Sequence, residues 1–313
     1  MKPHILLNFD LPPLEAALQA KYVIHRRSAI ANFETFLTEC GPQISVVVSF
    51  GALPIGAEIL DAMPKLKAIV LFSAGYDGLD LDLCKKRGLP VTTCSGANAG
   101  DVADMAFGLL LAVARNIPLV DRFVRAGHWT KENRGGGLRD GLYGSKLGIL
   151  GLGAIGMQIA RRASGFDMPV SYHNRKQRPD VDYSYEPDVM ALARSVDHLI
   201  IACPLTDETR NCITRDVLRA LGPKGILVNI ARGGVVDEPA LIESLKAGEI
   251  LGAGLDVFAD EPHVPAELRA LDNVVMMAHH AGFTRRVFRD MGALVEENIA
   301  RAIAGQELLN RVI

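Results

Sequence analysis

The chain has 313 residues, which exceeds the size at which a single hydrophobic core usually stops growing, so two domains are expected. Its 49% hydrophobic and 22% charged residues are typical of a globular protein, and no stretch approaches the roughly 18 uninterrupted apolar residues of a membrane span. A formal net charge of -2 provides no broad basic surface for nucleic acid, which favours small molecules as ligands.

The cysteines form an odd set of five without a CxxC pair: Cys40, Cys84, Cys94, Cys203 and Cys212. This pattern favours free thiols in a reducing cytoplasm over a disulfide framework or a zinc site. The first ten residues lack the apolar length of a secretion signal, so no export is expected. We therefore expect a cytoplasmic protein that binds neither membrane nor nucleic acid.

The first hundred residues alternate short apolar, β-branched runs with amphipathic stretches. Strands are expected at 4–9, 44–50, 67–73 and 90–94, and helices at 13–22 and 55–63. Continuous apolar strands separated by helices predict a parallel sheet covered on both faces. One long helical pattern then extends from Ala99 to about Gly127, and its apolar stretch 105–114 leaves no polar face, which indicates a buried helix.

The alternation of strands and helices restarts after this helix. Strands are expected at 146–153, 169–175, 198–204, 225–232, 252–258 and 273–279, with helices to about 164, near 186–195, at 237–247 and at about 284–304. Six strands in series with crossover helices are typical of a doubly wound sheet. We predict an α/β protein with two doubly wound parallel-sheet domains, residues 1–98 with 286–313 and residues 99–285.

A glycine-rich turn follows the first strand of the second unit. Gly151, Gly153 and Gly156 form a GxGxxG pattern directly after the apolar run 147–150 and at the start of a helical pattern. GxGxxG alone is weak evidence, but between a strand and a helix these glycines permit the close approach of a pyrophosphate to the helix N-terminus. The pattern predicts a dinucleotide site, with a purely structural turn as the alternative.

The segment after the next strand bears on the choice between NAD and NADP. NAD-preferring proteins place an Asp or Glu about twenty residues after the glycines to bind the ribose hydroxyls. The segment 171–178 has no carboxylate and carries Arg175, Lys176 and Arg178. NADPH is therefore the predicted cofactor, with Arg175 as the leading contact to the 2′-phosphate and Lys176 or Arg178 assisting. The alternative is a solvated basic loop without a ligand.

Three polar residues follow successive predicted strands, namely Arg232, Glu261 and His279. Ligands of open α/β sheets bind at the carboxyl ends of the strands, so all three are expected to face one crevice. Reduction of a 2-oxo acid requires an arginine for the carboxylate and carbonyl, a proton donor, and an anion that keeps this donor charged. The alternatives are a phosphate-binding arginine, a loop carboxylate and a packing histidine. Because His279 and His280 are adjacent and point apart, no metal site is expected.

Seven stretches of the sequence, in this order, resemble the D-isomer-specific 2-hydroxyacid dehydrogenases. They are residues 71–77, 98–115, 148–156, 203–211, 229–241, 254–262 and 273–282, and together they span nearly the whole chain. Within the family, the chain is most similar to glyoxylate/hydroxypyruvate reductases and plant hydroxyphenylpyruvate reductases. The resemblance implies a flavodoxin-like substrate domain, a Rossmann cofactor domain and a homodimer. It also implies NADPH-dependent reduction of glyoxylate and hydroxypyruvate to glycolate and D-glycerate.

The resemblance assigns catalytic roles to the three polar residues. Arg232 binds the carboxylate and carbonyl of the substrate, Glu261 orients the histidine, and His279 donates the proton. The sequence departs from the family at Ala278, where proline is usual, and at Phe283, where a small residue is common. The shape of the pocket near the histidine is therefore not implied by the resemblance.

Further positions are expected to bind substrate or cofactor. The resemblance implies that the main-chain amides of Ala74 and Gly75 hold the substrate carboxylate from the other domain. It also implies that Asp256 accepts a hydrogen bond from the nicotinamide carboxamide and that Trp129 reaches the pocket of a neighbouring subunit. The expected cofactor contacts are Val102, Gly151, Gly153, Ala154, Ile155, Asn174, Arg175, Lys176, Cys203, Pro204, Thr209, Ile230, Arg232, Asp256 and His279.

Other functions are possible for a chain with these motifs. Transcriptional co-repressors that sense the cofactor share the fold and the Arg/Glu/His trio, but the chain lacks tails or low-complexity segments for partners. Formate dehydrogenases carry Gln where Glu261 stands, which disfavours that activity. Phosphoglycerate dehydrogenase is a weaker alternative, and a hydroxyphenylpyruvate reductase would differ only in the 2-oxo acid that it reduces.

Overall fold

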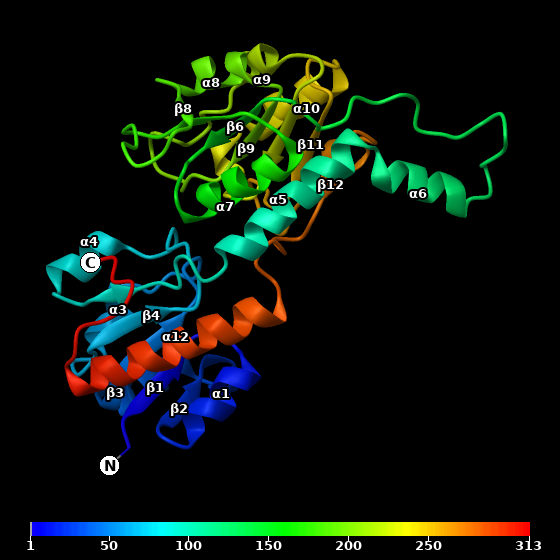
Figure 1. Ribbon diagram of the computed structural model, residues 1–313. Helices are drawn as coiled ribbons and strands as arrows, with labels where there is room; N and C mark the ends of the chain where they lie inside the picture. The colour runs from blue at the N-terminus through cyan, green and yellow to red at the C-terminus, as the bar shows by residue number, and fades with distance from the viewer. Residues whose placement is uncertain (1) are drawn as a thin grey trace. The chain divides into compact units, whose positions relative to one another are not determined.

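The computed structural model describes residues 2–313, which form two compact units (Figure 1). Unit 1 comprises the chain up to Asn98 together with Thr284–Ile313, and unit 2 comprises Ala99–Phe283. Each unit is built on a parallel sheet with helices on both faces. The predicted fold class is therefore confirmed.

Unit 1 contains a five-stranded sheet in the order β2-β1-β3-β4-β5. The strands are β1 (His4–Leu7), β2 (Val23–Arg26), β3 (Ile44–Ser49), β4 (Ala68–Leu71) and β5 (Val91–Thr92). The central strands β3 and β4 are almost entirely buried, as their continuous apolar sequences predict. The sequence analysis missed β2, because this edge strand reads Val-Ile-His-Arg and is only partly buried.

Helices cover both faces of the sheet in unit 1. On one face lie α1 (Pro12–Gln19) and the long α12 (Arg285–Ala304), which packs against β3 and β4. On the other face lie α2 (Phe33–Glu39), α3 (Ala57–Asp61) and α4 (Leu81–Lys86). The hydroxyl of Thr284 caps α12 by accepting a hydrogen bond from the Val287 amide. The last helix of the chain thus belongs to the unit that contains the N-terminal strands.

Unit 2 contains a seven-stranded sheet in the order β12-β11-β10-β9-β6-β7-β8. Its strands are β6 (Leu147–Leu150), β7 (Val170–His173), β8 (Ser184–Tyr185), β9 (His198–Ile201), β10 (Ile226–Asn229), β11 (Gly252–Leu255) and β12 (Val274–Met276). Six of them coincide with predicted strands. The edge strand β8 was missed, because two residues are too short to produce a periodic pattern.

Two apolar clusters cover the faces of the sheet in unit 2. One contains α5 (Ala99–Ala114) and α7 (Ala154–Ala163), and the other contains α8 (Val189–Ser195), α9 (Arg215–Leu221), α10 (Glu238–Lys246) and the short α11 (Ala266–Arg269). Short 3₁₀ helices lie at Arg27–Ala29, Gly41–Gln43, Ser164–Phe166 and Gly233–Val235. The buried surface of α5 agrees with its nearly uniform apolar sequence.

The helical pattern from Ala99 to Gly127 forms two helices, so the prediction of one long helix was wrong. After α5, helix α6 (Ile117–Arg125) continues at a bend of 61°. Asn116 adopts a left-handed φ of 53° at the break, and Pro118 in the first turn of α6 lacks the N–H that would continue α5. Among the described residues, only this bent pair, and no single helix, has the length and apolarity of a membrane span.

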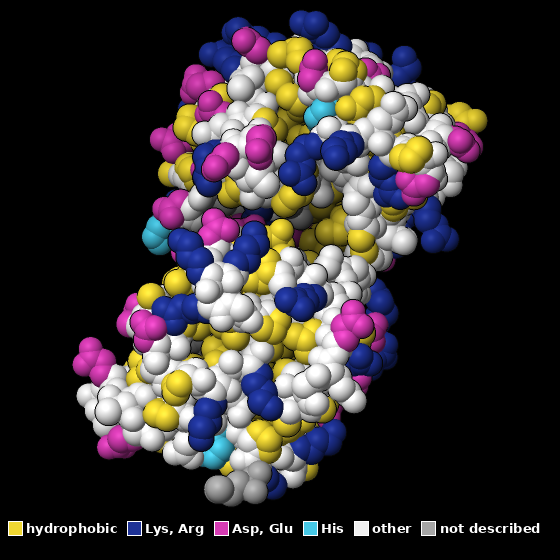
Figure 2. Space-filling model, turned by 90° about the vertical axis from the view of Figure 1, so that its left-hand side faces the viewer, with side chains coloured by type: hydrophobic (Ala, Val, Ile, Leu, Met, Phe, Trp, Pro, Cys, Tyr) yellow, Lys and Arg dark blue, Asp and Glu magenta, His cyan; other side chains and the backbone are white. Residues whose placement is uncertain are grey.

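Charges of both signs occur across the surface of each unit. Figure 2 shows Lys and Arg side chains near Asp and Glu side chains on the face that it draws. Some of these charges pair in unit 2, as in Arg122 with Asp272 and Arg215 with Glu249. Two arginines, Arg215 and Arg219, bind Glu249 and lower the pKa of its carboxyl to about 2.

Candidate active site

The glycine-rich turn lies between β6 and α7. Gly151 has a φ of 99°, and a Cβ atom at this position would lie 2.6 Å from the backbone nitrogen of Cys203. A Cβ atom at Gly156 would lie 2.3 Å from the carbonyl oxygen of Gly151. Helix α7 begins after Gly153 without a side-chain cap, so its first N–H groups are available to an anion. The turn therefore fits the pyrophosphate of a dinucleotide.

Two side chains from the loop after β7 hold this turn in place. Asn174 Oδ1 accepts a hydrogen bond from the Leu152 amide at 2.7 Å, and Arg178 Nη1 donates to the Leu152 carbonyl at 2.9 Å. The guanidinium of Arg178 also pairs with Asp180, a carboxylate just beyond the segment 171–178. Arg178 thus has partners within the chain, which makes it less suited to a phosphate.

Arg175 and Lys176 lie on the same loop and are exposed. Neither forms an ion pair within residues 2–313. The charge of Arg175 contributes to the lowered pKa of Glu208, whose main cause is a hydrogen bond from Thr206. These two cations therefore remain available to an anionic ligand beside the glycine-rich turn.

The three candidate catalytic residues lie beyond the carboxyl ends of three neighbouring strands. Arg232 follows β10, Glu261 lies on the loop after β11, and His279 follows β12. Gly233 permits close contact between two of these loops, because a Cβ atom there would lie 1.9 Å from the carbonyl carbon of Phe258. The topology thus brings the trio to one edge of the sheet in unit 2.

His279 and Glu261 form a hydrogen-bonded pair. His279 Nδ1 lies 2.8 Å from Glu261 Oε2, and the Phe258 amide donates to Glu261 Oε1 at 3.1 Å. The hydrogen bond to Glu261 raises the pKa of His279, with help from the negative charge of Glu261 and against the effect of burial. Because Nδ1 is engaged, Nε2 is the ring nitrogen that can face a substrate.

Glu261, the other member of this hydrogen-bonded pair, is stabilised in its ionised form. Burial raises the pKa of Glu261, but the hydrogen bonds from His279 and Phe258 outweigh this effect and the pKa lies below its usual value. The positive charge of Arg232 lowers the pKa of Glu261 and of His279, so it favours the ionised carboxylate and opposes the charged form of the histidine. The site therefore contains a histidine whose charged form is favoured, a carboxylate and an arginine, and the catalytic roles of the three residues stay predictions.

Buried Asp256 fixes the backbone that carries His279. Its carboxylate oxygens accept hydrogen bonds from the amides of His280 at 2.7 Å and Ala281 at 2.9 Å, and its carbonyl accepts from the His279 amide. His279 is thereby held at a left-handed φ of 55°, a conformation that is uncommon outside glycine and often found at functional sites. Burial raises the pKa of Asp256, although the two amides oppose this effect. The sequence analysis did not foresee this role, and the expected carboxamide contact stays a prediction.

Asn229 performs a similar task for the loop that carries Arg232. Its Nδ2 donates to the Arg232 carbonyl at 2.9 Å, and its Oδ1 accepts from the Ala231 amide at 3.0 Å. Arg232 Nη1 in turn donates to the Ala231 carbonyl at 2.7 Å. The sequence analysis missed Asn229, although a buried amide at the end of the apolar strand β10 was a usable signal.

A cavity of about 600 Å³ adjoins the pair of His279 and Glu261 within unit 2. Its lining is mostly apolar and comprises Phe258, Glu261, Pro262, Val264, Arg269, Met276, Met277, Ala278, His279 and His280. The ring of His280 lies 4.8 Å from the ring of Phe283, one of the two positions at which the sequence departs from the family. The cavity offers room for a small organic acid beside a proton donor.

The other expected cofactor residues also lie in unit 2. Buried Cys203 and Ile230 follow β9 and β10, and burial raises the pKa of the Cys203 thiol to about 12. Val102 is buried on α5, and Thr209 donates to the Pro204 carbonyl at 2.7 Å, which closes the loop after β9. Ala154 and Ile155 form the first turn of α7. Their contacts with the cofactor stay predictions.

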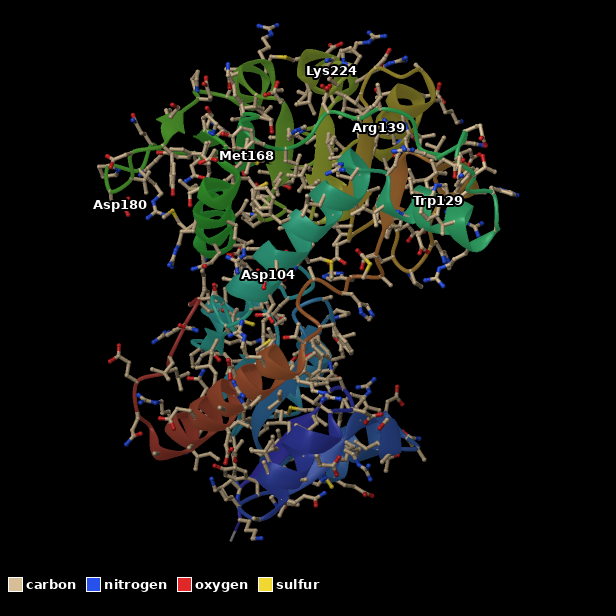
Figure 3. All side chains as sticks on the ribbon, turned by 45° about the vertical axis from the view of Figure 1, so that its right-hand side comes forward. Asp104, Trp129, Arg139, Met168, Asp180 and Lys224 are labelled. Atoms are coloured by element: carbon tan, nitrogen blue, oxygen red, sulfur yellow. The ribbon has the colours of Figure 1, made fainter. Side chains whose placement is uncertain are left out.

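The remaining expected contacts, Trp129 and the amides of Ala74 and Gly75, lie on loops. Trp129 is 64% exposed on the loop after α6, on the outside of unit 2 (Figure 3). Ala74 and Gly75 lie in unit 1 on the loop after β4, and within residues 2–313 their amides donate no hydrogen bond. These amides are therefore free to bind a carboxylate.

Comparison with known proteins gives consistent results. The model of the family "D-isomer specific 2-hydroxyacid dehydrogenase, NAD binding domain" matches residues 107–281. The chain is 41% identical over 300 residues to a hydroxyphenylpyruvate reductase of Plectranthus scutellarioides, covering 96% of this chain and 95% of the relative. A glyoxylate/hydroxypyruvate reductase A of Arabidopsis thaliana is 42% identical over 300 residues, with the same coverage.

A similar solved structure is the NADPH-dependent glyoxylate/hydroxypyruvate reductase of Sinorhizobium meliloti in complex with NADP and malonate. It superposes with a TM-score of 0.90 at 34% sequence identity, covering 100% of this chain and 97% of that chain. The likeness extends over both units, and so over the glycine-rich turn and the trio alike.

Proposed function

Because the chain belongs to the D-isomer-specific 2-hydroxyacid dehydrogenase family, we propose that it reduces glyoxylate and hydroxypyruvate to glycolate and D-glycerate with NADPH. Membership makes it an NAD(P)-dependent oxidoreductase. The observation that supports the proposed chemistry best is the bond between His279 and Glu261, which favours a charged proton donor beside an arginine. Glyoxylate/hydroxypyruvate reductases among the relatives support the choice of substrates.

The residues that would hold the cofactor are those of the glycine-rich turn and the loop after β7. The amides at the start of α7 would bind the pyrophosphate, and Arg175 and Lys176 would bind the 2′-phosphate. Bound NADPH supplies the hydride that reduces the carbonyl carbon. The preference for NADPH is supported by the two exposed cations and by the pairing of Asp180 with Arg178, which keeps this carboxylate from serving as a ribose ligand.

The trio supplies the acid and the electrostatic part of the reaction. The guanidinium of Arg232 would bind the carboxylate and polarise the carbonyl of the substrate. Protonated His279 would deliver a proton from Nε2 to the carbonyl oxygen, while Glu261 holds the ring and stabilises its charge. The amides of Ala74 and Gly75 would bind the carboxylate oxygens. Asp256 would position His279 and accept from the carboxamide.

The proposal extends to organisation and location. Unit 1 would serve as the substrate-binding domain and unit 2 as the NAD(P)-binding domain, which agrees with the match of the cofactor-domain model to residues 107–281. We propose a cytoplasmic homodimer in which exposed Trp129 reaches the pocket of the neighbouring subunit. Size-exclusion chromatography with light scattering of the wild type and of Trp129→Ala would test this assembly.

Asn174 provides a test of the cofactor site that does not depend on the phosphate. In Asn174→Ala the Leu152 amide loses its acceptor, which costs about 0.5–1.5 kcal/mol and loosens the glycine-rich turn. We expect binding of NADPH and NADH to weaken by the same factor, roughly two- to tenfold, in fluorescence titrations. Asn273→Ala removes another amide of unit 2, which donates to the Leu245 and Leu251 carbonyls and not to the glycine-rich turn, and serves as the control. Loss of only one cofactor would contradict this role.

A turnover assay with a panel of substrates tests the proposed function. Oxidation of NADPH and NADH is followed with glyoxylate, hydroxypyruvate, pyruvate and 4-hydroxyphenylpyruvate. We expect the highest kcat/KM with NADPH and either glyoxylate or hydroxypyruvate. A preference for 4-hydroxyphenylpyruvate would select the second candidate, an aryl-pyruvate reductase, which the apolar cavity and the Plectranthus relative favour. No turnover of any substrate, together with tight cofactor binding, would indicate a cofactor-sensing protein instead.

A further inference from the structure

Ser73 joins two loops at the carboxyl ends of β3 and β4 in unit 1. Its hydroxyl accepts a hydrogen bond from the Gly51 amide at 2.9 Å and donates one to the Gly75 carbonyl at 2.7 Å. The Cys94 amide donates to the Ser73 carbonyl at 2.8 Å, so the backbone of this residue is held as well. A single side chain thus fixes the loop 73–76 to the loop that begins at Gly51.

The bond between Ser73 and Gly75 closes a small ring. This ring includes the peptide groups whose N–H groups belong to Ala74 and Gly75. Both amides lack a partner within residues 2–313, and the carbonyl of Gly75 is the acceptor that the hydroxyl captures. Because the carbonyl is fixed, the two amides can turn only by a small angle and are oriented before a ligand arrives.

The packing around Ser73 leaves little room for another arrangement. A Cβ atom on Gly51 would lie 1.8 Å from the Gly75 carbonyl oxygen and 2.8 Å from Ser73 Oγ. The Gly78 amide donates to the Gly51 carbonyl at 2.7 Å, which ties the far side of the loop to the same glycine. The hydroxyl therefore occupies a site where two backbones meet closely and where both of its hydrogen-bonding functions are used.

We propose that Ser73 is a positioning residue that orients the Ala74 and Gly75 amides toward the carboxylate of a 2-oxo acid. This inference rests on the proposed function and adds to it a residue that touches neither substrate nor cofactor. A carboxylate keeps its charge throughout the reduction, so the amides bind the ground state and the transition state equally. Loss of their orientation therefore weakens substrate binding and leaves the chemical step unchanged.

The test compares Ser73→Ala with Ser49→Ala. Ser49 is the control, a buried serine at the end of β3. Its hydroxyl accepts a hydrogen bond from Asn8 and donates one to the Phe50 carbonyl, but it forms no hydrogen bond with the loop 73–76. For Ser73→Ala we expect KM for glyoxylate and hydroxypyruvate to rise roughly tenfold while kcat changes less than about threefold. Binding of oxamate to the NADPH complex, measured by fluorescence without turnover, is expected to weaken by the same factor, and NADPH affinity to stay constant.

The outcomes separate this inference from the proposed function. A wild type that reduces no 2-oxo acid overturns the proposed function and this inference with it. An active wild type with unchanged KM and unchanged oxamate binding in Ser73→Ala overturns the inference alone, as does an equal rise of KM in Ser49→Ala. Should Ser73→Ala fail to fold, Gly51→Ala displaces the Gly75 carbonyl from the other side and is expected to raise KM in the same way.

Discussion

The Glu261→Gln variant is expected to lose activity at lower pH than the wild type when kcat/KM for 2-oxo acid reduction is measured against pH. In the proposed reaction the active form of His279 is the imidazolium, and the hydrogen bond to Glu261 raises the pKa of this ring. Activity therefore persists at low pH and falls as pH rises through that pKa. Glutamine retains the shape and an acceptor but no charge, so the pKa of His279 drops. The descending limb of the plot of kcat/KM against pH therefore moves to lower pH.

Asp260→Asn is the matched control for this experiment. Asp260 is the exposed neighbour of Glu261 on the same loop, and its carboxylate does not bond to the histidine. The same loss of one negative charge is expected to leave the limb in place. His279→Ala is expected to remove the limb and to lower kcat/KM by roughly a hundred- to ten-thousandfold. A limb that is unchanged in Glu261→Gln, or that moves upward, would show that Glu261 does not tune the acid.

Arg175→Ala is expected to weaken NADPH binding by roughly ten- to a hundredfold and to leave NADH binding nearly unchanged. A charge-assisted hydrogen bond contributes about 1.5–3 kcal/mol, and only NADPH has the 2′-phosphate that would accept it. Arg175 is exposed beside the glycine-rich turn, whereas Arg178 already binds Asp180 and the Leu152 carbonyl. Titration of each cofactor by fluorescence at fixed salt measures the two dissociation constants.

Arg161→Ala provides the control for the loss of a positive charge. Arg161 is also exposed in unit 2, but it lies in the last turn of α7, at the end opposite the glycine-rich turn. Its removal is expected to change neither dissociation constant. An equal loss of NADPH and NADH affinity in Arg175→Ala would contradict the assignment, because it would mean that this arginine binds a group common to both cofactors.

The sequence predicted the elements whose patterns are long and buried. The strands that carry Arg232, Glu261 and His279 are continuous apolar runs, and the rule that parallel strands end at one edge was sufficient to bring the three residues together. The sequence did not predict features that depend on only one or two residues. Strand β8 has two residues, and the break between α5 and α6 depends on one left-handed residue, Asn116.

The supporting contacts of the site were harder to predict than the site itself. Asp256 and Asn229 act through hydrogen bonds to backbone amides, and such bonds depend on loop geometry that no periodic pattern encodes. Asp180 lies two residues beyond Arg178, and only the fold of the loop shows that they pair. Ser73 lies in the stretch 71–77 that resembles the family, but its proposed role follows from contact with Gly51, more than twenty residues away.

We propose that this protein transfers hydride from a nicotinamide to the 2-oxo carbon of a small acid. The most direct measurement uses hydroxypyruvate and NADPH that carries deuterium at both C4 positions, followed by mass spectrometry and chiral analysis of the product. We expect D-glycerate with one deuterium at C2 and none elsewhere, because the proton from His279 reaches only the exchangeable hydroxyl. Glycerate without deuterium, the L enantiomer, or cofactor that stays reduced in the presence of every 2-oxo acid would contradict the claim.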